Sequence, residues 1–247
     1  MVMYKVSAVS YLNTLPFIYG LKTSELINSI NLQLDYPAIC ADKLINAEVD
    51  IALVPVTVLP KLKHYNIISN YCIGADGAVD TVCLYSNVPI SEIKEIALDY
   101  QSRTSVALLK VLLKEYWDLN PELIKAEVGF EDTINVENAA LVIGDRAFDL
   151  NYKYKYVYDL SALWKEMTGL PFVFACWVAI KDLPNQFLSD FNAALQNGLN
   201  NIDKAILMEV DNYPSRVSPE EYLNNKISYN FNKEKQKGMN LFLSKIR

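Results

Sequence analysis

A polar turn that follows a short apolar run and begins a helix occurs four times in this chain of 247 residues. The turns are Ser10–Thr14, Pro55–Thr57, Gln101–Ser105 and Gly144–Asp145. Apolar runs of strand length that alternate with helical patterns predict βαβ units, and therefore an α/β fold with a mainly parallel sheet and right-handed crossovers. Ligands of open α/β folds bind outside the carboxyl ends of the strands, where helix N-termini favour anions. The four turns are thus candidate walls of a small-anion site.

The βα units fall into two groups along the chain. Extended crossings near 79–88 and 171–180 join the groups, and the later helices return to the first group. Two crossings and a returning C-terminal part predict a two-lobed protein with a cleft between its lobes, as in hinged ligand-binding proteins. The expected first lobe comprises 1–84 with 178–247, and the expected second lobe comprises 85–177.

Composition limits the classes of partner. The chain is 51% hydrophobic, enough for a large core, and it has a formal net charge of -6 and a pI of about 4.9. An acidic chain without a Lys/Arg cluster is a poor partner for nucleic acid or for an anionic membrane surface. Its N-terminus, MVMYKVSAV, lacks the features of a signal peptide, and no run approaches the roughly 18 apolar residues of a membrane span. We therefore expect a cytoplasmic protein that binds neither nucleic acid nor membrane.

Cysteine and histidine indicate neither a disulfide framework nor a metal site. The cysteines are widely spaced in apolar surroundings, which favours buried free thiols at Cys40, Cys72, Cys83 and Cys176. The one histidine, His64, lies in a polar loop and is expected to be solvated. Glycine-rich nucleotide loops, Walker loops, nucleophile elbows and zinc-protease motifs are also missing from the sequence, so we expect no cofactor.

The turn Gln101–Ser105 is the strongest anion site on physical grounds. Hydroxyl groups, helix N–H groups and the guanidinium of Arg103 come together there. The alternative is that Ser102 and Thr104 only cap the following helix while Arg103 is solvated.

Asn13 presents a similar choice. Its side chain either caps a helix, as Asn commonly does, or directs its amide at a ligand. On the first crossing, Thr81 is most simply a β-branched strand residue and Asp80 an exposed strand carboxylate. On the second crossing, Phe172, Phe174 and Trp177 are most simply core residues.

Four segments of the chain resemble, in the same order, segments of the chorismate dehydratases of the futalosine route to menaquinone. They are Val9–Pro16, Ser102–Leu109, Leu141–Asp145 and Thr168–Trp177, among which the Ser-Tyr-Leu-Asn and Thr-Gly-Leu-Pro-Phe-Val-Phe-Ala motifs are the more specific. The resemblance implies a periplasmic-binding-protein-like fold of the second type that works as a cytoplasmic carbon–oxygen lyase (hydro-lyase). The implied reaction removes water from chorismate, a dianion, to give 3-[(1-carboxyvinyl)oxy]benzoate without a metal or organic cofactor.

The resemblance also implies roles for two residues. An Asn at the position of Asn13 and a small hydroxyl residue on the first crossing strand are associated with the reaction in that family, and Thr81 matches the second. The family pattern Gly-Pro-Val-Arg-Ser becomes Gly77-Ala78-Val79-Asp80-Thr81 here, so the hydroxyl is kept while Pro and Arg are replaced. We expect the substrate-binding walls to comprise Ser10, Tyr11, Pro55, Val56, Ser102, Arg103, Thr104, Ser105, Gly144, Asp145 and Phe174.

No general base is evident in the sequence. Elimination makes the substrate ring aromatic, so the protein needs to hold one conformer, help hydroxide leave and provide a place for the proton. Because His64 lies in a polar loop and the orientation of Asp145 is open, one hypothesis is that a carboxylate of the substrate takes the proton.

Three other functions compete with this interpretation. The first is a related menaquinone-pathway enzyme of the same fold that acts on a later intermediate, against which the Thr168–Trp177 segment argues. The second is a non-enzymatic small-anion-binding protein, for which we would expect a signal peptide. The third is a ligand-sensing domain, for which we would expect a DNA-binding helix-turn-helix.

Overall fold

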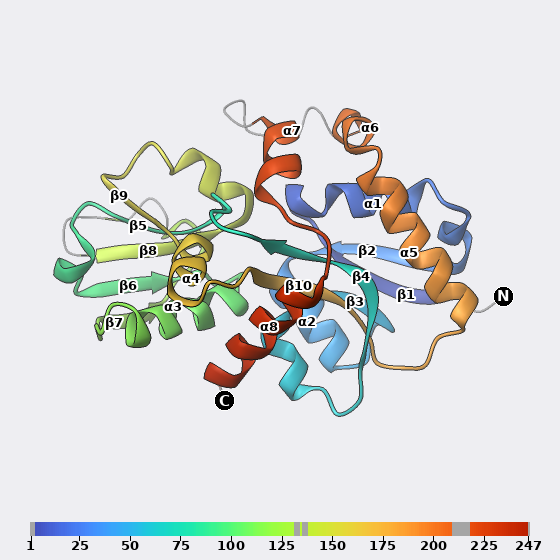
Figure 1. Ribbon diagram of the computed structural model, residues 1–247, viewed down its shortest axis with the longest axis horizontal. Coiled ribbons are helices and arrows are strands. Elements are labelled where there is room, and N and C mark those ends of the chain that lie inside the picture. Colours follow the sequence, from blue (N-terminus) through green and yellow to red (C-terminus); the bar gives the residue numbers. More distant parts are fainter. Residues whose placement is uncertain (1–2, 131–133, 135–137, 209–217, 247) are drawn as a thin grey trace.

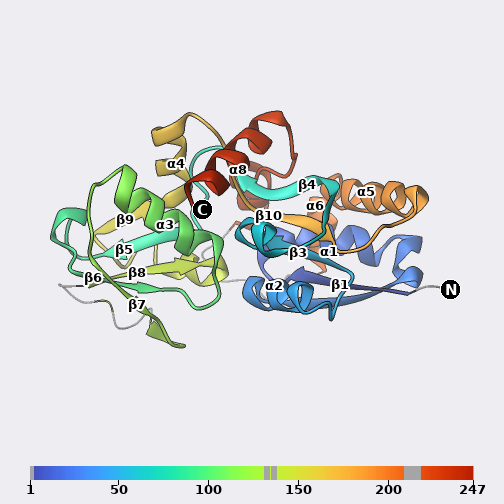
Figure 2. The same ribbon diagram turned by 90° about the horizontal axis from the view of Figure 1, so that it is seen from below.

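Two five-stranded sheets form the framework of the molecule. The computed structural model describes residues 3–130, 134, 138–208 and 218–246. Figure 1 shows the sheets in two lobes that lie side by side along the longest axis, and Figure 2 shows the same separation after a quarter turn. The predicted two-lobed α/β fold is therefore confirmed.

The first lobe contains the sheet with strand order β2-β1-β3-β10-β4. Its strands are β1 (Tyr4–Val9), β2 (Ile30–Asp35), β3 (Ile51–Pro55), β4 (Asn66–Ala75) and β10 (Phe172–Ala179). Its helices are α1 (Leu15–Lys22), α2 (Pro37–Ile45), α5 (Asn185–Leu199) and α6 (Ile202–Leu207), with the short 3-10 turns η1 (Leu12–Thr14), η2 (Glu25–Ser29) and η3 (Val56–Lys61). A Cβ on Gly198 would lie 1.8 Å from the carbonyl oxygen of Pro16, so only glycine allows α1 and α5 to pack this closely.

The second lobe contains the sheet with strand order β7-β6-β8-β5-β9. Its strands are β5 (Val82–Ser86), β6 (Glu95–Leu98), β7 (Glu122–Lys125), β8 (Asn138–Ile143) and β9 (Tyr156–Asp159). Its helices are α3 (Thr104–Glu115) and α4 (Leu160–Thr168), with the 3-10 turns η4 (Ile90–Glu92) and η6 (Gly144–Asp149). The Asp159 carboxylate caps α4 by accepting from the N–H groups of Ser161 and Ala162, and Gly169 at φ 73° ends the helix.

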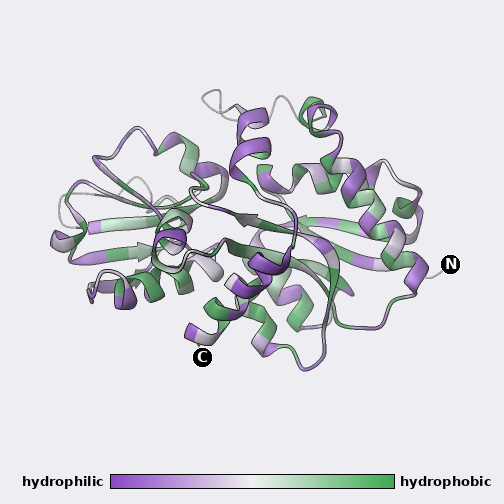
Figure 3. Ribbon diagram, in the orientation of Figure 1, coloured by the Kyte–Doolittle hydropathy of each residue, from purple (hydrophilic) through white to green (hydrophobic). Residues whose placement is uncertain are grey.

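Both sheets are mixed, so the prediction of a mainly parallel sheet is wrong. β1 pairs in parallel with β2 and β3, and β6 pairs in parallel with β7 and β8. The strands that follow the two crossings reverse direction: β10 is antiparallel to β3 and β4, and β5 is antiparallel to β8 and β9. A strand that enters a sheet from the other lobe makes no βαβ crossover, and the parallel rule for such units does not govern it. Figure 3 shows that the strands of both sheets carry many of the hydrophobic residues.

The division into 1–84 with 178–247 and 85–177 stays a prediction. Its two boundaries lie within β5 and β10, each of which belongs to one sheet along its whole length. We propose that the lobes divide just before each of these strands, at the crossings 76–81 and 169–171.

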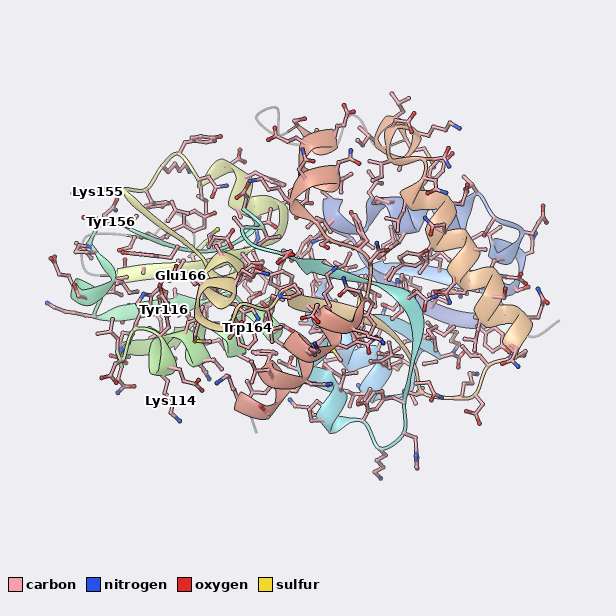
Figure 4. The ribbon with its side chains drawn as sticks, viewed as in Figure 1. Lys114, Tyr116, Lys155, Tyr156, Trp164 and Glu166 are labelled. Atoms are coloured by element: carbon pink, nitrogen blue, oxygen red, sulfur yellow. The ribbon has the colours of Figure 1, made fainter. Side chains whose placement is uncertain are left out.

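The C-terminal segment lies against both lobes. It consists of α7 (Pro219–Glu221), the π-helical turn η8 (Tyr222–Lys226) and α8 (Lys233–Lys245). Trp164 of α4, which Figure 4 places where the lobes meet, has its ring centroid 5.5 Å from that of Phe172 and 5.9 Å from that of Phe242 in α8. Within the described residues, no helix has the length and apolar character needed to cross a membrane.

Candidate functional site

A cavity of about 60 Å3 lies between the lobes where the four strand-to-helix turns meet. Nine predicted site residues line it: Tyr11, Asn13, Pro55, Thr81, Ser102, Thr104, Ser105, Gly144 and Phe174. The rest of the wall is apolar and comprises Val9, Pro37, Ile73, Val79, Val82, Ile143, Ala175 and Ile227. The lining does not include the predicted residues Ser10, Val56, Arg103 and Asp145.

Tyr11 brings the first lobe into contact with the second. Its hydroxyl donates to Oε1 of Gln101, whose Nε2 donates to the hydroxyl of Tyr100 at 3.0 Å. Burial raises the pKa of Tyr11, so the hydroxyl stays protonated and able to donate. Gly144 has φ 68°, and a Cβ there would lie 2.7 Å from the Tyr11 ring. Glycine is thus required at this point both for its backbone conformation and for the closeness of the ring.

Asp145 makes a second contact between the lobes. Its two carboxylate oxygens accept from the backbone N–H of Leu12 at 3.2 and 3.1 Å. Burial raises the pKa of this carboxyl group to about 6, while the Leu12 N–H partly opposes the rise. The carboxylate therefore holds the first turn of one lobe against the fourth turn of the other.

Asp99 fixes the two turns of the second lobe relative to each other. Its carboxylate accepts from the N–H groups of Gln101 and Ile143, each at 2.9 Å, and pairs with Nη2 of Arg146 at 2.6 Å. Its side chain is fully buried, and burial raises the pKa of the carboxyl group. Breaking this cluster would leave a buried charge without partners, which is strongly destabilising.

Asn13 does not cap a helix, so that interpretation of the residue is wrong. Neither η1 nor α1 has a side-chain cap. Instead, Oδ1 of Asn13 accepts from the Thr14 hydroxyl at 3.0 Å, and its backbone carbonyl accepts from the Tyr229 hydroxyl at 2.9 Å. The backbone is thereby fixed while the side chain faces the cavity.

Thr81 lies on the opposite lobe, directly before β5, and is 1% exposed. The turn that carries it is held by Asp159, whose carboxylate accepts from the N–H groups of Val79 and Asp80 at 2.8 and 2.7 Å. The Thr81 hydroxyl lies 2.7 Å from the hydroxyl of Tyr222. The site therefore receives a third contribution, from the C-terminal segment.

Asp80 is not the exposed strand carboxylate that the sequence predicts. It precedes the strand in a left-handed conformation with φ 64°, which Asp tolerates better than most residues. Its carboxylate pairs with Nζ of Lys226 at 2.9 Å. The strained turn directs the next residue, Thr81, into the cavity.

The start of α3 forms the polar floor of the cavity. The Ser102 hydroxyl accepts from the N–H of Ser105 at 3.1 Å, so Ser102 caps the helix while also lining the cavity. The Thr104 hydroxyl donates to the carbonyl of Phe174 at 3.1 Å and lies 3.5 Å from the hydroxyl of Thr57. Two of the four turns and β10 are thus connected at this point.

Arg103 points away from the cavity that Asn13 and Thr81 line. Its guanidinium pairs with Asp42 of α2 at 2.6 Å, an exposed contact between the lobes that contributes little to stability. Arg103 borders a neighbouring groove, which Ser102 also lines. Five cationic residues line this groove, namely Lys61, Arg103, Lys110, Lys114 and Lys245, against the single acid Glu115. We call it the basic groove; Lys114 can be located in Figure 4.

The lining of the cavity is almost free of ionisable groups. Among the residues that the structure describes, those lining the cavity include no carboxylate, imidazole, ammonium or guanidinium group, and Tyr11 is the one titratable side chain among them. His64 is exposed, as predicted, and the four cysteines are buried and free, also as predicted. The described residues contain no group of three or more His, Cys, Asp or Glu side chains that could hold a metal ion. The polar groups available to a ligand are neutral hydroxyls, amides and helix N–H groups.

Sequence reasoning missed Tyr222 and Tyr229. Their partners in the site, Thr81 and Asn13, lie 141 and 216 positions earlier in the chain. No local motif marks either tyrosine, and only the expected return of the C-terminal helices to the first group suggested that this segment lies near the cleft.

The family described as "Menaquinone biosynthesis" matches residues 4–247. A chorismate dehydratase of Thermus thermophilus is 32% identical over 161 residues, which cover 57% of this chain and 58% of that enzyme. A chorismate dehydratase of Campylobacter jejuni is 29% identical over 191 residues, which cover 74% of this chain and 71% of that enzyme. The chain thus aligns with less than two thirds of the length of the Thermus enzyme.

Solved structures share the fold at low sequence identity. A protein from Archaeoglobus fulgidus has a TM-score of 0.76 at 18% identity and covers 98% of this chain and 96% of its own. An alkanesulfonate-binding protein from Xanthomonas axonopodis pv. citri has a TM-score of 0.66 at 11% identity and covers 99% of this chain and 93% of its own. The predicted periplasmic-binding-protein-like fold is confirmed.

Proposed function

Because this chain belongs to the menaquinone biosynthesis family, we propose that it is a chorismate dehydratase, a carbon–oxygen lyase that removes water from chorismate. The product would be 3-[(1-carboxyvinyl)oxy]benzoate. The observation that carries the proposal is the cavity itself, which neutral hydrogen-bonding side chains from both lobes surround. The two named relatives supply the substrate class.

In this proposal the start of α3 receives one carboxylate of the dianionic substrate. A helix of this length concentrates partial positive charge at its N-terminus, and the hydroxyls of Ser102 and Ser105 lie beside it. The basic groove next to the cavity raises the local concentration of anions around an acidic protein. Binding therefore needs no cation within the cavity.

Asn13 and Thr81 are proposed to assist the departure of the ring hydroxyl. They approach the cavity from opposite lobes, so a substrate held between them contacts both. The carbon–hydrogen bond next to the leaving group breaks, the electron pair forms the third ring double bond, and the carbon–oxygen bond breaks. Hydroxide leaves and becomes water by taking up the proton released from the ring carbon, while the aromatic ring formed supplies the driving force.

A carboxylate of the substrate is proposed to accept the ring proton first and then to pass it to the departing hydroxide. The cavity offers no carboxylate or imidazole of its own, and the nearby Asp145 is engaged with the Leu12 N–H. The covalent bonds of the substrate hold this carboxylate close to the proton that it accepts. Such intramolecular proximity is highly effective in lowering a reaction barrier.

The direct test is to incubate purified protein with chorismate and to identify the product by mass and ultraviolet spectrum. Formation of the aromatic enol ether is the expected result. Tight binding of unchanged chorismate would instead favour a small-anion-binding protein, a class to which the Xanthomonas neighbour belongs. Neither binding nor turnover would favour an enzyme that acts on a later intermediate. The cytoplasmic location stays a prediction.

A further inference from the structure

Tyr222 connects the two residues that the proposed function assigns to the chemistry. It is 3% exposed, and its hydroxyl lies 2.7 Å from that of Thr81. The turn η1, which carries Asn13, packs against η8, which carries Tyr222, and the Asn13 side chain lowers the pKa of the Tyr222 hydroxyl. The phenol ring is held edge-on by Phe148, with ring centroids 4.9 Å apart. One rigid group of the C-terminal segment therefore meets a residue from each lobe.

The directions of the hydrogen bonds can be worked out from the donors and acceptors available. Oδ1 of Asn13 already accepts from the Thr14 hydroxyl at 3.0 Å, which leaves the amide nitrogen as the group that can donate to Tyr222. This contact lowers the pKa of Tyr222 against the larger rise that burial causes, as expected when the amide donates to the phenol oxygen. The tyrosine proton is then available to Thr81.

Thr81 keeps its own proton free for a ligand under this arrangement. With its oxygen accepting from Tyr222, the hydroxyl must donate elsewhere. The carbonyl of Val79, at 3.4 Å, is at the long limit of a hydrogen bond. A substrate oxygen in the cavity would be a better acceptor, and the second amide hydrogen of Asn13 can reach the same cavity.

We propose that Tyr222 is a positioning residue of this site, whose hydroxyl orients the Asn13 amide and the Thr81 hydroxyl so that both donate into the cavity. The inference rests on the proposed function, in which these two donors stabilise the leaving hydroxide. Donors that are oriented before the reaction are more effective than donors that must reorganise, and serial hydrogen bonds strengthen one another. Tyr222 touches no reacting atom and acts through its two partners.

Tyr222→Phe tests this role, because the ring and its packing against Phe148 are retained while the hydroxyl is lost. We expect kcat for chorismate to fall by about 10- to 100-fold, somewhat less than for removal of a direct donor, with KM changed less than about threefold. The control is Tyr71→Phe, which removes the hydroxyl of another buried tyrosine, whose partner is Oε1 of Gln196 on α5. The control should retain kcat within about twofold.

A double-mutant cycle with Thr81→Val separates positioning from a general effect on stability. If Tyr222 acts through Thr81, then Tyr222→Phe added to Thr81→Val should cost less than about threefold further in kcat. Full additivity of the two losses would overturn the proposal, and so would a Tyr222→Phe variant whose kcat is within twofold of the wild type.

A spectroscopic measurement keeps this inference separate from the proposed function. The side-chain amide resonances of Asn13, assigned by their loss in Asn13→Ala, should shift in Tyr222→Phe and not in Tyr71→Phe. Unshifted resonances would overturn the positioning role whether or not chorismate is converted. Absence of turnover by the wild-type protein, with the expected resonance shift, would refute the proposed function alone.

Discussion

Replacing Asp145 by Asn separates a substrate-assisted mechanism from one that uses an enzyme base. The carboxylate accepts from the Leu12 N–H at 3.1 and 3.2 Å and does not line the cavity, although burial raises its pKa to about 6. A raised pKa in a cleft is typical of general bases, so the residue is the strongest rival to the substrate carboxylate. The amide oxygen of Asn can still accept from Leu12. We therefore expect kcat to fall less than about tenfold, whereas losing a general base costs about 10²- to 10⁴-fold.

The same substitution has a calculable effect on stability. Because the pKa rises from 3.8 to about 6 on folding, the native state binds more protons than the unfolded state between these values. The free energy of unfolding should therefore decrease as the pH rises from about 4 to 6, by about 2 to 3 kcal/mol from this group. Asp145→Asn cannot ionise, so its stability should lack this decrease.

The assay combines steady-state turnover of chorismate at pH 7 with urea unfolding of both proteins at pH 4, 5, 6 and 7. Turnover reports the catalytic role, and the difference between the two unfolding curves reports the titration. A loss of kcat beyond 10³-fold in a variant that remains folded would identify Asp145 as the base and refute the substrate-assisted step. A constant difference in stability across this pH range would refute the assignment of a raised pKa.

Three further substitutions test the cleft with the same chorismate assay. Asn13→Ala should lower kcat by about 10²- to 10³-fold, the effect of removing a positioned donor, and a near-wild-type rate would exclude it from the reaction. Gly144→Ala should raise KM at least tenfold, because the new Cβ would lie 2.7 Å from the tyrosine ring that closes the lobes; an unchanged KM would show that closure is not needed. Lys110→Glu with Lys114→Glu should lower kcat/KM severalfold at low salt and have little effect at about 1 M salt, whereas Lys204→Glu on α6 should have neither effect. A loss that is independent of salt would contradict attraction of the substrate by the basic groove.

The strands and the polar turns that follow them could be predicted from the sequence, because local residue patterns encode both. The carboxyl ends of parallel strands lie at one edge of a sheet, so the gathering of the turns at the cleft could be predicted as well. The apolar run of Phe172–Ala179 is typical of a buried strand, and Asp159 and Gly169 at the ends of α4 are residue types typical of helix caps. The direction of β5 and β10 was not evident, since it depends on which sheet a strand joins after leaving the other lobe. Hydrophobic pattern is the same for a parallel and an antiparallel partner when both faces are buried.

The location of the site and most of its lining could be predicted from the sequence. The contacts between residues that are distant in sequence could not. Arg103 was expected at the anion, but Asp42 of the other lobe pairs with it. The basic groove could not be predicted, because Lys61 and Lys245 are far apart in the sequence and meet the lysines of α3 only in the folded protein. The role of Tyr222 could not be predicted for the same reason. No local pattern distinguishes a tyrosine that belongs to a site from one that belongs to the core.

The central claim is that chorismate is dehydrated in the cavity between the lobes, and a crystal structure with the product bound tests it most directly. We expect 3-[(1-carboxyvinyl)oxy]benzoate between Asn13 and Thr81, with a carboxylate at the start of α3 within hydrogen-bond distance of Ser102 or Ser105. A product molecule bound only in the basic groove, with the cavity filled by water, would contradict the account.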